Sequence, residues 1–194
     1  HEHLEYYSLK SLKYLLDKAG LKVINLSFNQ INGGSIEVDI AKKKSKQIEC
    51  KHLINWVLES ERLNKYNEII KHKQFFKECQ NHKILLKKLL LTLKKQNKKI
   101  LGYGASTKGN VLLQYCNIDS KVLDCIAEVN KFKFNKYTPG SNIKIISEKA
   151  AKLKKPDYML ALPWHFKDHI IKREQSFLKK GGKIIFPLPD IEII

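Results

Sequence analysis

The chain has 194 residues and a hydrophobic share of 43%, enough for one ordinary domain or for one domain and part of another. No apolar run reaches the roughly 18 residues of a membrane span, and the N-terminus lacks the basic-then-apolar pattern of a secretion signal. The formal net charge is +18, nearly all of it from lysine. These features exclude an integral membrane protein of the helical class, and we expect no membrane partner and a cytoplasmic location.

The positive charge has two interpretations. It is typical of proteins that bind polyanions such as nucleic acid, and it is equally what a general bias toward lysine produces. Arginine, which reads bases and grips phosphate with two parallel bonds, occurs only at Arg62 and Arg173. Because the lysines are scattered and no nucleic-acid-binding motif is visible, we expect no nucleic-acid partner.

The first region predicts a helix followed by a hairpin. Ser8 is a suitable N-cap for SLKSLKYLLDKAG, and Gly20 stands where a helix often ends. LKVINLSF and SIEVDIA read as two antiparallel strands joined by a turn at NGGS. A helix and a hairpin cannot bury a core alone, so this region is expected to be the tail of something larger.

The second region, about 47–97, is expected to form two long helices. Leucine and isoleucine recur at helical spacing, and neither Gly nor Pro occurs between Ser35 and Leu101. We expect a break near residues 70–75. One apolar stripe is predicted around Leu53 to Leu58 and another from Leu85 to Leu93.

The third region, 98–194, alternates strands with helices. KKILGYG, KVLDCIAEV, IKII, PDYMLALP and KIIFPLP are strand-like, the last being the final strand expected, and a helix of about 166–179 precedes the GG pair. Such alternation predicts a parallel sheet with crossover helices, so the fold class is α/β with a Rossmann-like, doubly wound, mostly parallel sheet. Ligands of such sheets bind at the carboxyl ends of the strands.

The stretch GYGASTKG (102–109) ends the first of these strands and begins a helix. Its glycines permit close backbone approach, Ser106 and Thr107 offer hydroxyl groups, and Lys108 offers a charge for an anion. The spacing fits neither a dinucleotide fingerprint nor a P-loop, so the ligand is left open. The alternative is a tightly packed turn with a solvated lysine. Glu128, near the end of the next strand, stands where nucleotide-binding folds often place a ribose-binding carboxylate.

Two further stretches carry groups with useful chemistry. HEH at residues 1–3 sets two imidazoles beside a carboxylate, which suits a general base, although a ragged polar end explains it as well. Trp164 and His165 follow a strand at the edge where ligands bind, and Trp164 suits a core or lid position equally. The four cysteines have no C-x-x-C spacing and no histidine completes a zinc site, so free thiols and no bound metal are expected.

Taken together, six stretches resemble one family in order and approximate spacing, that of the nucleotide-sugar C-methyltransferases. These stretches are HEHLEYYSLKSLKYLL, NGGSIEV, GYGASTKGNVLL, KYTPGSNI, PDYMLALPWHF and GGKIIFPLP. Members of this family add a methyl group to a carbon of a nucleotide-linked keto-deoxysugar. The resemblance runs nearly end to end and is least typical in the lysine-rich residues 42–100.

The resemblance implies a domain plan. The family combines a zinc module, a central S-adenosylmethionine domain and a Rossmann-like C-terminal domain. Residues 1–41 are then expected to be the tail of the central domain, 42–97 a helical linker region, and 98–194 the C-terminal domain. Zinc would belong only to the N-terminal module, and the methyl-donor loop would also lie outside the chain, so we expect these 194 residues to be inactive alone.

The resemblance also implies a mechanism. His3 would act as the base that removes a proton next to the ketone, with Glu2 orienting the site and His1 beside it, and the resulting enolate would take the methyl group of S-adenosylmethionine. The partner would be a dTDP-linked sugar. The residues expected to bind this substrate are Gly102, Gly104, Ser106, Lys108, Trp164 and His165.

The chain departs from the family pattern at two positions, with His165 replacing an expected asparagine and Glu128 an expected aspartate. A second hypothesis remains beside the first: a Rossmann-like domain that binds NAD, FAD, S-adenosylmethionine or another nucleotide without methyltransferase activity. The G-x-G after a strand supports it, whereas Thr107 in place of a third glycine speaks against it.

Overall fold

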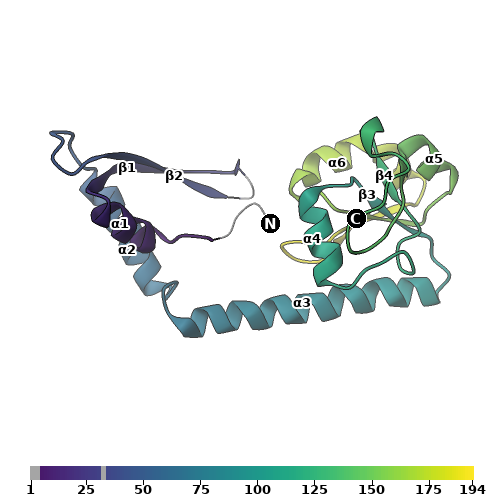
Figure 1. Ribbon diagram of the computed structural model, residues 1–194. Coiled ribbons are helices and arrows are strands. Elements are labelled where there is room, and N and C mark those ends of the chain that lie inside the picture. Colours follow the sequence, from purple (N-terminus) through teal and green to yellow (C-terminus); the bar gives the residue numbers. More distant parts are fainter. Residues whose placement is uncertain (1–4, 32–33) are drawn as a thin grey trace. The chain divides into compact units, whose positions relative to one another are not determined.

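The computed structural model describes residues 5–31 and 34–194, so the predicted catalytic residues His1, Glu2 and His3 lie outside the described residues. The chain forms two compact units, His1–Glu78 and Cys79–Ile194, each of which is treated by itself (Figure 1). The assignment of residues 1–41 to a methyltransferase domain, 42–97 to a linker and 98–194 to a C-terminal domain stays a prediction.

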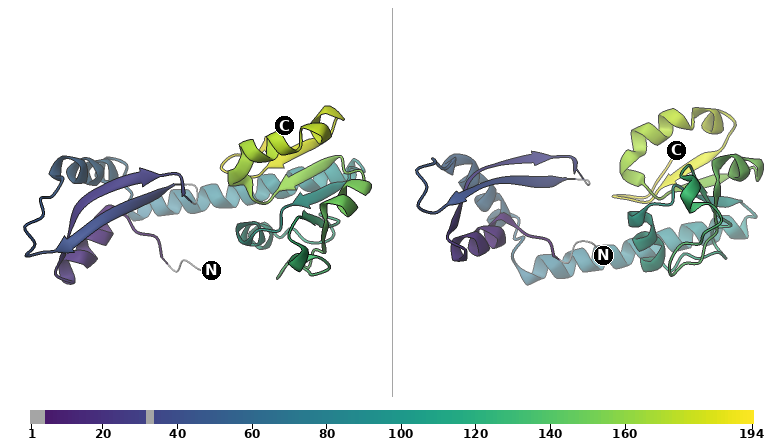
Figure 2. Two further views of the ribbon diagram at one scale, coloured as in Figure 1. Left: turned by 90° about the horizontal axis from the view of Figure 1, so that it is seen from above. Right: turned by 45° about the horizontal axis from the view of Figure 1, so that its top comes forward.

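The first unit begins with helix α1 (Leu9–Lys18) and the antiparallel strands β1 (Leu21–Asn29) and β2 (Ser35–Lys42), as predicted (Figure 2). Ser8 caps α1 by accepting a bond from the Ser11 amide, and Gly20 ends the turn with a φ of +73°. Helix α2 (Lys51–Leu63) follows and supplies Ile54 and Val57 to a small core shared with α1 and β1.

The break between the two long helices was predicted too late in the chain. Helix α2 ends at Leu63 and α3 (Ile69–Lys95) begins at Ile69, so the break precedes residues 70–75. Lys65, in the break, has a φ of +57°, a left-handed conformation that no glycine signalled. In the predicted second stripe, Leu86, Leu90 and Leu93 are buried, but Leu85 is exposed.

The second unit contains a six-stranded sheet in the order β5-β4-β3-β6-β7-β8. Five strands are parallel and only β8 runs antiparallel, which confirms the α/β, Rossmann-like, doubly wound class. The strands are β3 (Ile100–Tyr103), β4 (Ile126–Glu128), β5 (Ile145–Ser147), β6 (Tyr158–Ala161), β7 (Lys183–Phe186) and β8 (Glu192–Ile193). The helices that join them are α4 (Thr107–Tyr115), α5 (Glu148–Leu153), α6 (Lys167–Arg173) and α7 (Gln175–Lys179), with short 3₁₀ turns at Lys131–Lys133 and Trp164–Phe166.

Helices cover both faces of this sheet. The C-terminal half of α3 and helix α4 pack on one face, where Ile100, Leu160 and Ile185 join a single core with Leu90 and Leu113. Helices α5, α6 and α7 pack on the other face, in two smaller cores. Successive residues of β3 alternate between the faces, as a pleated strand requires.

Three predicted elements of the second unit need correction. The strand predicted over KVLDCIAEV is only three residues long, because a turn at 120–122 and a bend at 124 precede it, although Val122 and Leu123 are still buried. The helix predicted over 166–179 is interrupted at the buried Glu174. KIIFPLP is not the last strand, since β8 returns to pair with β7.

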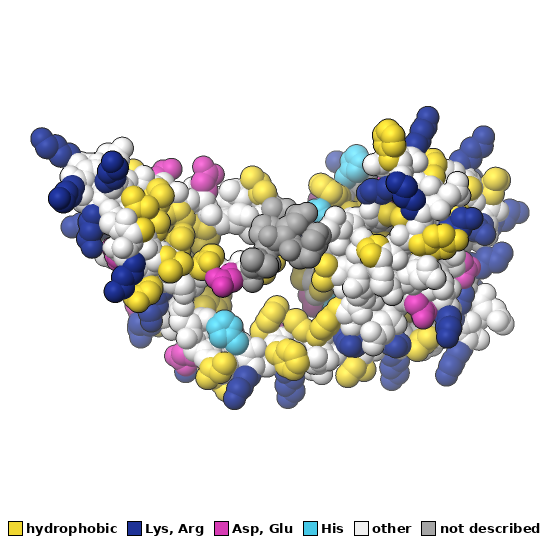
Figure 3. All heavy atoms as spheres, in the orientation of Figure 1, with side chains coloured by type: hydrophobic (Ala, Val, Ile, Leu, Met, Phe, Trp, Pro, Cys, Tyr) yellow, Lys and Arg dark blue, Asp and Glu magenta, His cyan; other side chains and the backbone are white. Residues whose placement is uncertain are grey.

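The positive charge is spread over the surface of both units. Figure 3 shows Lys and Arg side chains over the visible face of each unit, and not gathered in one patch. Within the described residues, no helix is long and apolar enough to cross a membrane.

Candidate functional site

The candidate site lies at the carboxyl ends of β3 and β6, neighbouring parallel strands from which the sheet grows in opposite directions. Such a switch point leaves a crevice where ligands of doubly wound sheets bind. The loops that leave β3 and β6 both begin here, so the structure brings GYGASTKG (102–109) together with the segment that contains Trp164 and His165.

The glycines of the first loop allow close packing within the protein. A Cβ on Gly104, which has a φ of +76°, would lie 2.9 Å from the Pro163 ring in the second loop. A Cβ on Gly102, buried within β3, would lie 2.7 Å from Ile126 Cγ1. Packing of the two loops and two strands therefore already requires glycine at both positions.

The helix that follows the loop is capped by a predicted site residue. The Ser106 hydroxyl accepts a 2.9 Å bond from the Gly109 amide and so begins α4. A hydroxyl that accepts one bond can also donate one. Lys108, half-buried in the first turn, lies close enough to His165 for its charge to act on the imidazole. Although His165 is largely exposed, the neighbouring protein atoms remove part of its hydration, and this effect first, and the Lys108 charge second, lower the pKa of the ring, which favours the neutral imidazole at pH 7.

Trp164 has a structural position at the same edge. Its side chain is partly buried and packs against the cores on both faces of the sheet. The His165 ring stacks obliquely on the Phe166 ring, with centroids 4.3 Å apart, and both side chains are exposed. The tryptophan therefore anchors the second loop, and the histidine and phenylalanine extend from it.

A cavity of about 250 Å³ opens between this edge and the inner face of α6. Apolar groups from Gly104, Pro163, Phe166 and Ile170 form part of its wall. The rest of its lining includes two cations, two carboxylates and one imidazole, namely Lys133, Arg173, Glu128, Glu148 and His169.

Glu128, at the end of β4, is held entirely by the protein. One carboxylate oxygen accepts bonds from the amides of Val129 (2.7 Å) and Asn130 (2.9 Å), and the other accepts the Ala105 amide (2.8 Å). Lys133 lies 3.8 Å from the same carboxylate and donates a 2.8 Å bond to the Ala105 carbonyl. The side chain suggested by sequence as a ribose ligand thus also fixes the conformation of the loop after β3.

A buried charged cluster under the cavity escaped sequence reasoning. The Tyr103 hydroxyl donates a 3.1 Å bond to Glu174, which is only 1% exposed and forms a 3.0 Å ion pair with Lys152. Burial first, and the nearby Glu174 carboxylate second, raise the pKa of Tyr103. Arg173 contacts both Glu148 and Glu174. The only sequence signal for this cluster was Glu174, between two short helices, and in the sequence it reads as an ordinary surface charge.

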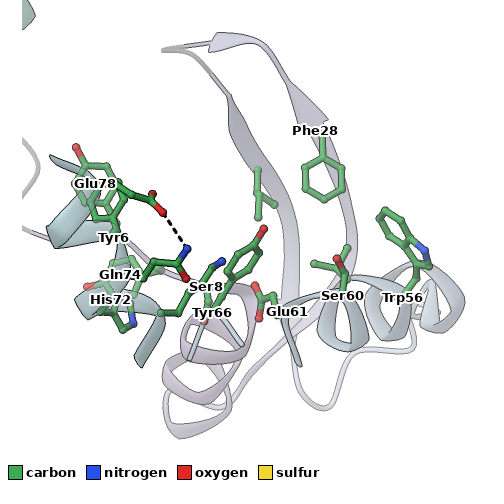
Figure 4. A pocket seen from close by; sticks show the side chains of 15 residues that line it. Tyr6, Ser8, Phe28, Trp56, Ser60, Glu61, Tyr66, His72, Gln74 and Glu78 are labelled. Carbon is green, nitrogen blue, oxygen red and sulfur yellow. Dashed lines mark hydrogen bonds between the residues drawn. The ribbon is translucent and has the colours of Figure 1, made fainter. Parts of the chain in front are cut away.

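The first unit has its own cavity, of about 620 Å³, next to the segment that follows HEH (Figure 4). Aromatic side chains line much of it, namely Tyr6, Tyr7, Phe28, Trp56, Tyr66 and Phe75. Glu61, only 6% exposed, accepts bonds from the Leu9 and Lys10 amides at 2.5 and 3.0 Å and so caps α1 from α2. This contact fixes where the chain enters α1. The cysteines are free thiols, as predicted, and no group of three or more potential metal ligands is found in residues 5–31 and 34–194.

Comparison with known proteins agrees with this arrangement. The family model described as the C-methyltransferase C-terminal domain matches residues 30–189. The whole chain is 32% identical over 194 residues to a C-methyltransferase, NovU, of Streptomyces niveus, and it covers 46% of that relative. The chain thus spans about half the length of the curated relative that it matches. The chain belongs to the C-methyltransferase family, through its C-terminal domain.

Proposed function

We propose that the chain is the C-terminal part of an S-adenosylmethionine-dependent C-methyltransferase that acts on a nucleotide-linked keto-deoxysugar. The observation that carries this proposal is the placement of Ser106 and Lys108 at the start of α4, after β3, and of His165 in the loop after β6, on both sides of the switch point of a doubly wound sheet. The similarity to a C-methyltransferase over the whole chain supports it.

In this proposal the second unit binds the nucleotide part of the substrate. Lys108 and the first turn of α4 offer positive charge and a helix N-terminus to the diphosphate, and Ser106 offers its hydroxyl proton. His165, kept neutral by its lowered pKa, donates or accepts a hydrogen bond without adding charge. Binding the nucleotide part of the substrate here would leave the attached sugar free to reach the reacting groups.

The chemistry in this proposal belongs to HEH. His3 takes the proton from the carbon next to the ketone, the C–H electron pair becomes an enolate, and Glu2 and His1 support the base. Glu61 caps α1 a few residues later and so fixes the start of that helix.

S-adenosylmethionine supplies an electrophilic methyl group when it is bound. The described residues do not fit a site for S-adenosylmethionine. In the first unit, no strand among residues 5–31 and 34–78 leads through a glycine-rich loop into a helix. In the second unit, the Ala105 amide of the glycine-rich loop already donates its hydrogen bond to Glu128. We therefore assign the methyl donor no residues in this chain.

The test is calorimetric titration of the 194-residue chain with dTDP, NAD and S-adenosylmethionine in parallel. We expect dTDP to bind and the other two not to bind. Lys108→Ala should weaken dTDP binding at least tenfold, whereas the matched Lys179→Ala in α7 should leave it unchanged. Tight NAD binding, with no response to dTDP, would instead establish the second candidate, a dinucleotide-binding domain, which the strand order and the G-x-G turn favour. Methyl transfer to a dTDP-4-keto sugar by this chain alone would contradict the expectation that the donor site lies outside it.

A further inference from the structure

A second cavity of the second unit lies at the amino ends of β6 and β7, the edge of the sheet opposite the candidate site. Its volume is about 490 Å³, against about 250 Å³ for the cavity at the switch point. The larger volume falls in the range of about 300–1,000 Å³ that is usual for sites of small molecules. Helices α5 and α7, which lead into these two strands, both contribute their C-terminal ends to the lining.

Apolar residues form a fixed part of this lining. Met159 in β6 is 1% exposed and Pro156 is also buried, so the surface that they present to the cavity is held in place by the core. The Phe177 ring packs so closely on the backbone of Gly182 that a Cβ there would lie 2.3 Å from two ring atoms. The Gly182 amide also donates a 3.1 Å bond to the Phe177 carbonyl. The cavity therefore offers a preformed apolar surface to a ring or an alkyl group.

The polar side chains of the lining are cationic. They are Lys152, Lys155 and Lys180, with the hydroxyl of Ser176, and no carboxylate is among the described residues that line the cavity. Lys152 forms a 3.0 Å ion pair with the buried Glu174. In the part of the chain that the structure describes, neither Lys155 nor Lys180 has an ion-pair partner. The lining thus attracts an anion, whereas the cavity at the switch point pairs its cations with carboxylates.

The backbone conformation of Lys155 is a second and independent sign of a site. Lysine at a helix C-terminus is favoured by the helix dipole, so charge here does not by itself indicate a ligand. Lys155, however, follows α5 with a φ of +50°, the left-handed position that Gly20 takes after α1 and Gly181 after α7. Of the six non-glycine residues with positive φ in the described ranges, four are asparagine, which tolerates this conformation better. A lysine thus stands where glycine would be less strained, and it lines the cavity.

We propose that this cavity binds a small organic anion with an apolar body, of the class of aryl phosphates and aryl carboxylates. Lys155 and Lys180 bind the anionic group, and the Ser176 hydroxyl can donate a hydrogen bond to it. Met159 and Phe177 contact the apolar body. The site lies at the opposite edge of the sheet from Lys108, so the inference goes beyond the proposed function and does not depend on it.

The test is amide NMR of the ¹⁵N-labelled 194-residue chain, titrated separately with phenyl phosphate, benzoate, inorganic phosphate and benzyl alcohol. At least one of the two aryl anions should shift the Met159, Phe177 and Gly182 signals to saturation, and the tighter of them identifies the anionic group. Inorganic phosphate and benzyl alcohol, which each lack one half of the ligand, should bind at least about tenfold more weakly. The proposal is overturned if neither aryl anion shifts these signals, or if one of the two half-ligands binds as tightly as the aryl anion.

Lys155→Gly provides the second arm. Glycine adopts the left-handed conformation without strain, so the Tm should not fall, whereas affinity for the aryl anion should drop roughly fivefold or more. The control is Lys65→Gly, the same substitution at a φ of +57° in the first unit, which removes the same charge and should leave the affinity unchanged. Full affinity in Lys155→Gly, or an equal loss in both variants, would refute the assignment of Lys155 to a site. None of these readouts involves dTDP.

Discussion

The most direct check on the packing of the site is Gly109→Ala in the first turn of α4. By helix propensity alone this change stabilises a helix by about 1 kcal/mol. The structure predicts the opposite result. A Cβ at this position would lie 2.6 Å from Leu162 Cβ and 2.9 Å from the Ser106 hydroxyl that caps the helix.

The magnitude follows from the missing space. Apolar carbon atoms in contact are separated by about 3.5–4.0 Å, so the new methyl group is roughly 1 Å too close to Leu162, which is fully buried and cannot turn away. Overpacking of this kind costs about 1–3 kcal/mol. After the gain in propensity of about 1 kcal/mol, we expect a net loss of up to about 2 kcal/mol, and for a unit of this size each kcal/mol lowers the Tm by about 4 °C.

The assay is urea and thermal unfolding followed by circular dichroism, with Val111→Ala as control. Val111 is 54% exposed in the same helix, so its replacement tests propensity without crowding and should change stability by less than about 0.5 kcal/mol. Because Leu162 directly precedes Pro163, the displaced loop should also weaken dTDP binding severalfold. A variant that is more stable than the wild type by the full propensity gain would refute the close approach of α4 to this loop.

Three further predictions concern other buried groups. Tyr103→Phe removes a hydrogen bond to the buried Glu174 carboxylate. Because folding raises the pKa of Tyr103, its hydroxyl stabilises the folded state below pH about 10, and this stabilisation is lost as the pH rises further. The variant should therefore be less stable than the wild type at neutral pH and lose less stability in alkali. Glu61→Ala leaves two amides at the start of α1 without their carboxylate partner and should cost about 2–3 kcal/mol, with hydrogen exchange of those amides at least tenfold faster. Burial raises the pKa of the Cys116 and Cys125 thiols, so a thiol reagent at pH 8 should label exposed Cys50 quickly and these two only after unfolding.

Each of these has a clear contrary result. An alkaline stability profile of Tyr103→Phe parallel to that of the wild type would contradict the raised pKa. Unchanged exchange at the start of α1 in Glu61→Ala, with Glu59→Ala on the exposed side of α2 as control, would contradict the capping role. Labelling of all the cysteines at one rate in the native protein would contradict their different burial.

Local signals in the sequence were sufficient for most helices and strands. Ser8 and Gly20 bracket α1 because their cap conformations are local properties, and the alternation of apolar runs with helical stretches gave the parallel sheet. Local sequence signals failed where a contact with a distant residue decides the local conformation. The left-handed Lys65 ends the helical run early, the turn at 120–122 interrupts residues that read as a strand, and β8 forms by pairing with the edge of β7.

The sequence by itself determined that GYGASTKG joins a strand to a helix and that Trp164 and His165 follow another strand at the same edge, since the order of elements in a doubly wound sheet follows from their alternation. Only the tertiary structure decided what the loop holds. Ala105 and Glu128 are brought together by the pairing of β3 with β4, and the amide that reads as a free phosphate donor is bonded to that carboxylate. Hydrogen bonds between residues far apart in the chain depend on strand register, which no local pattern encodes.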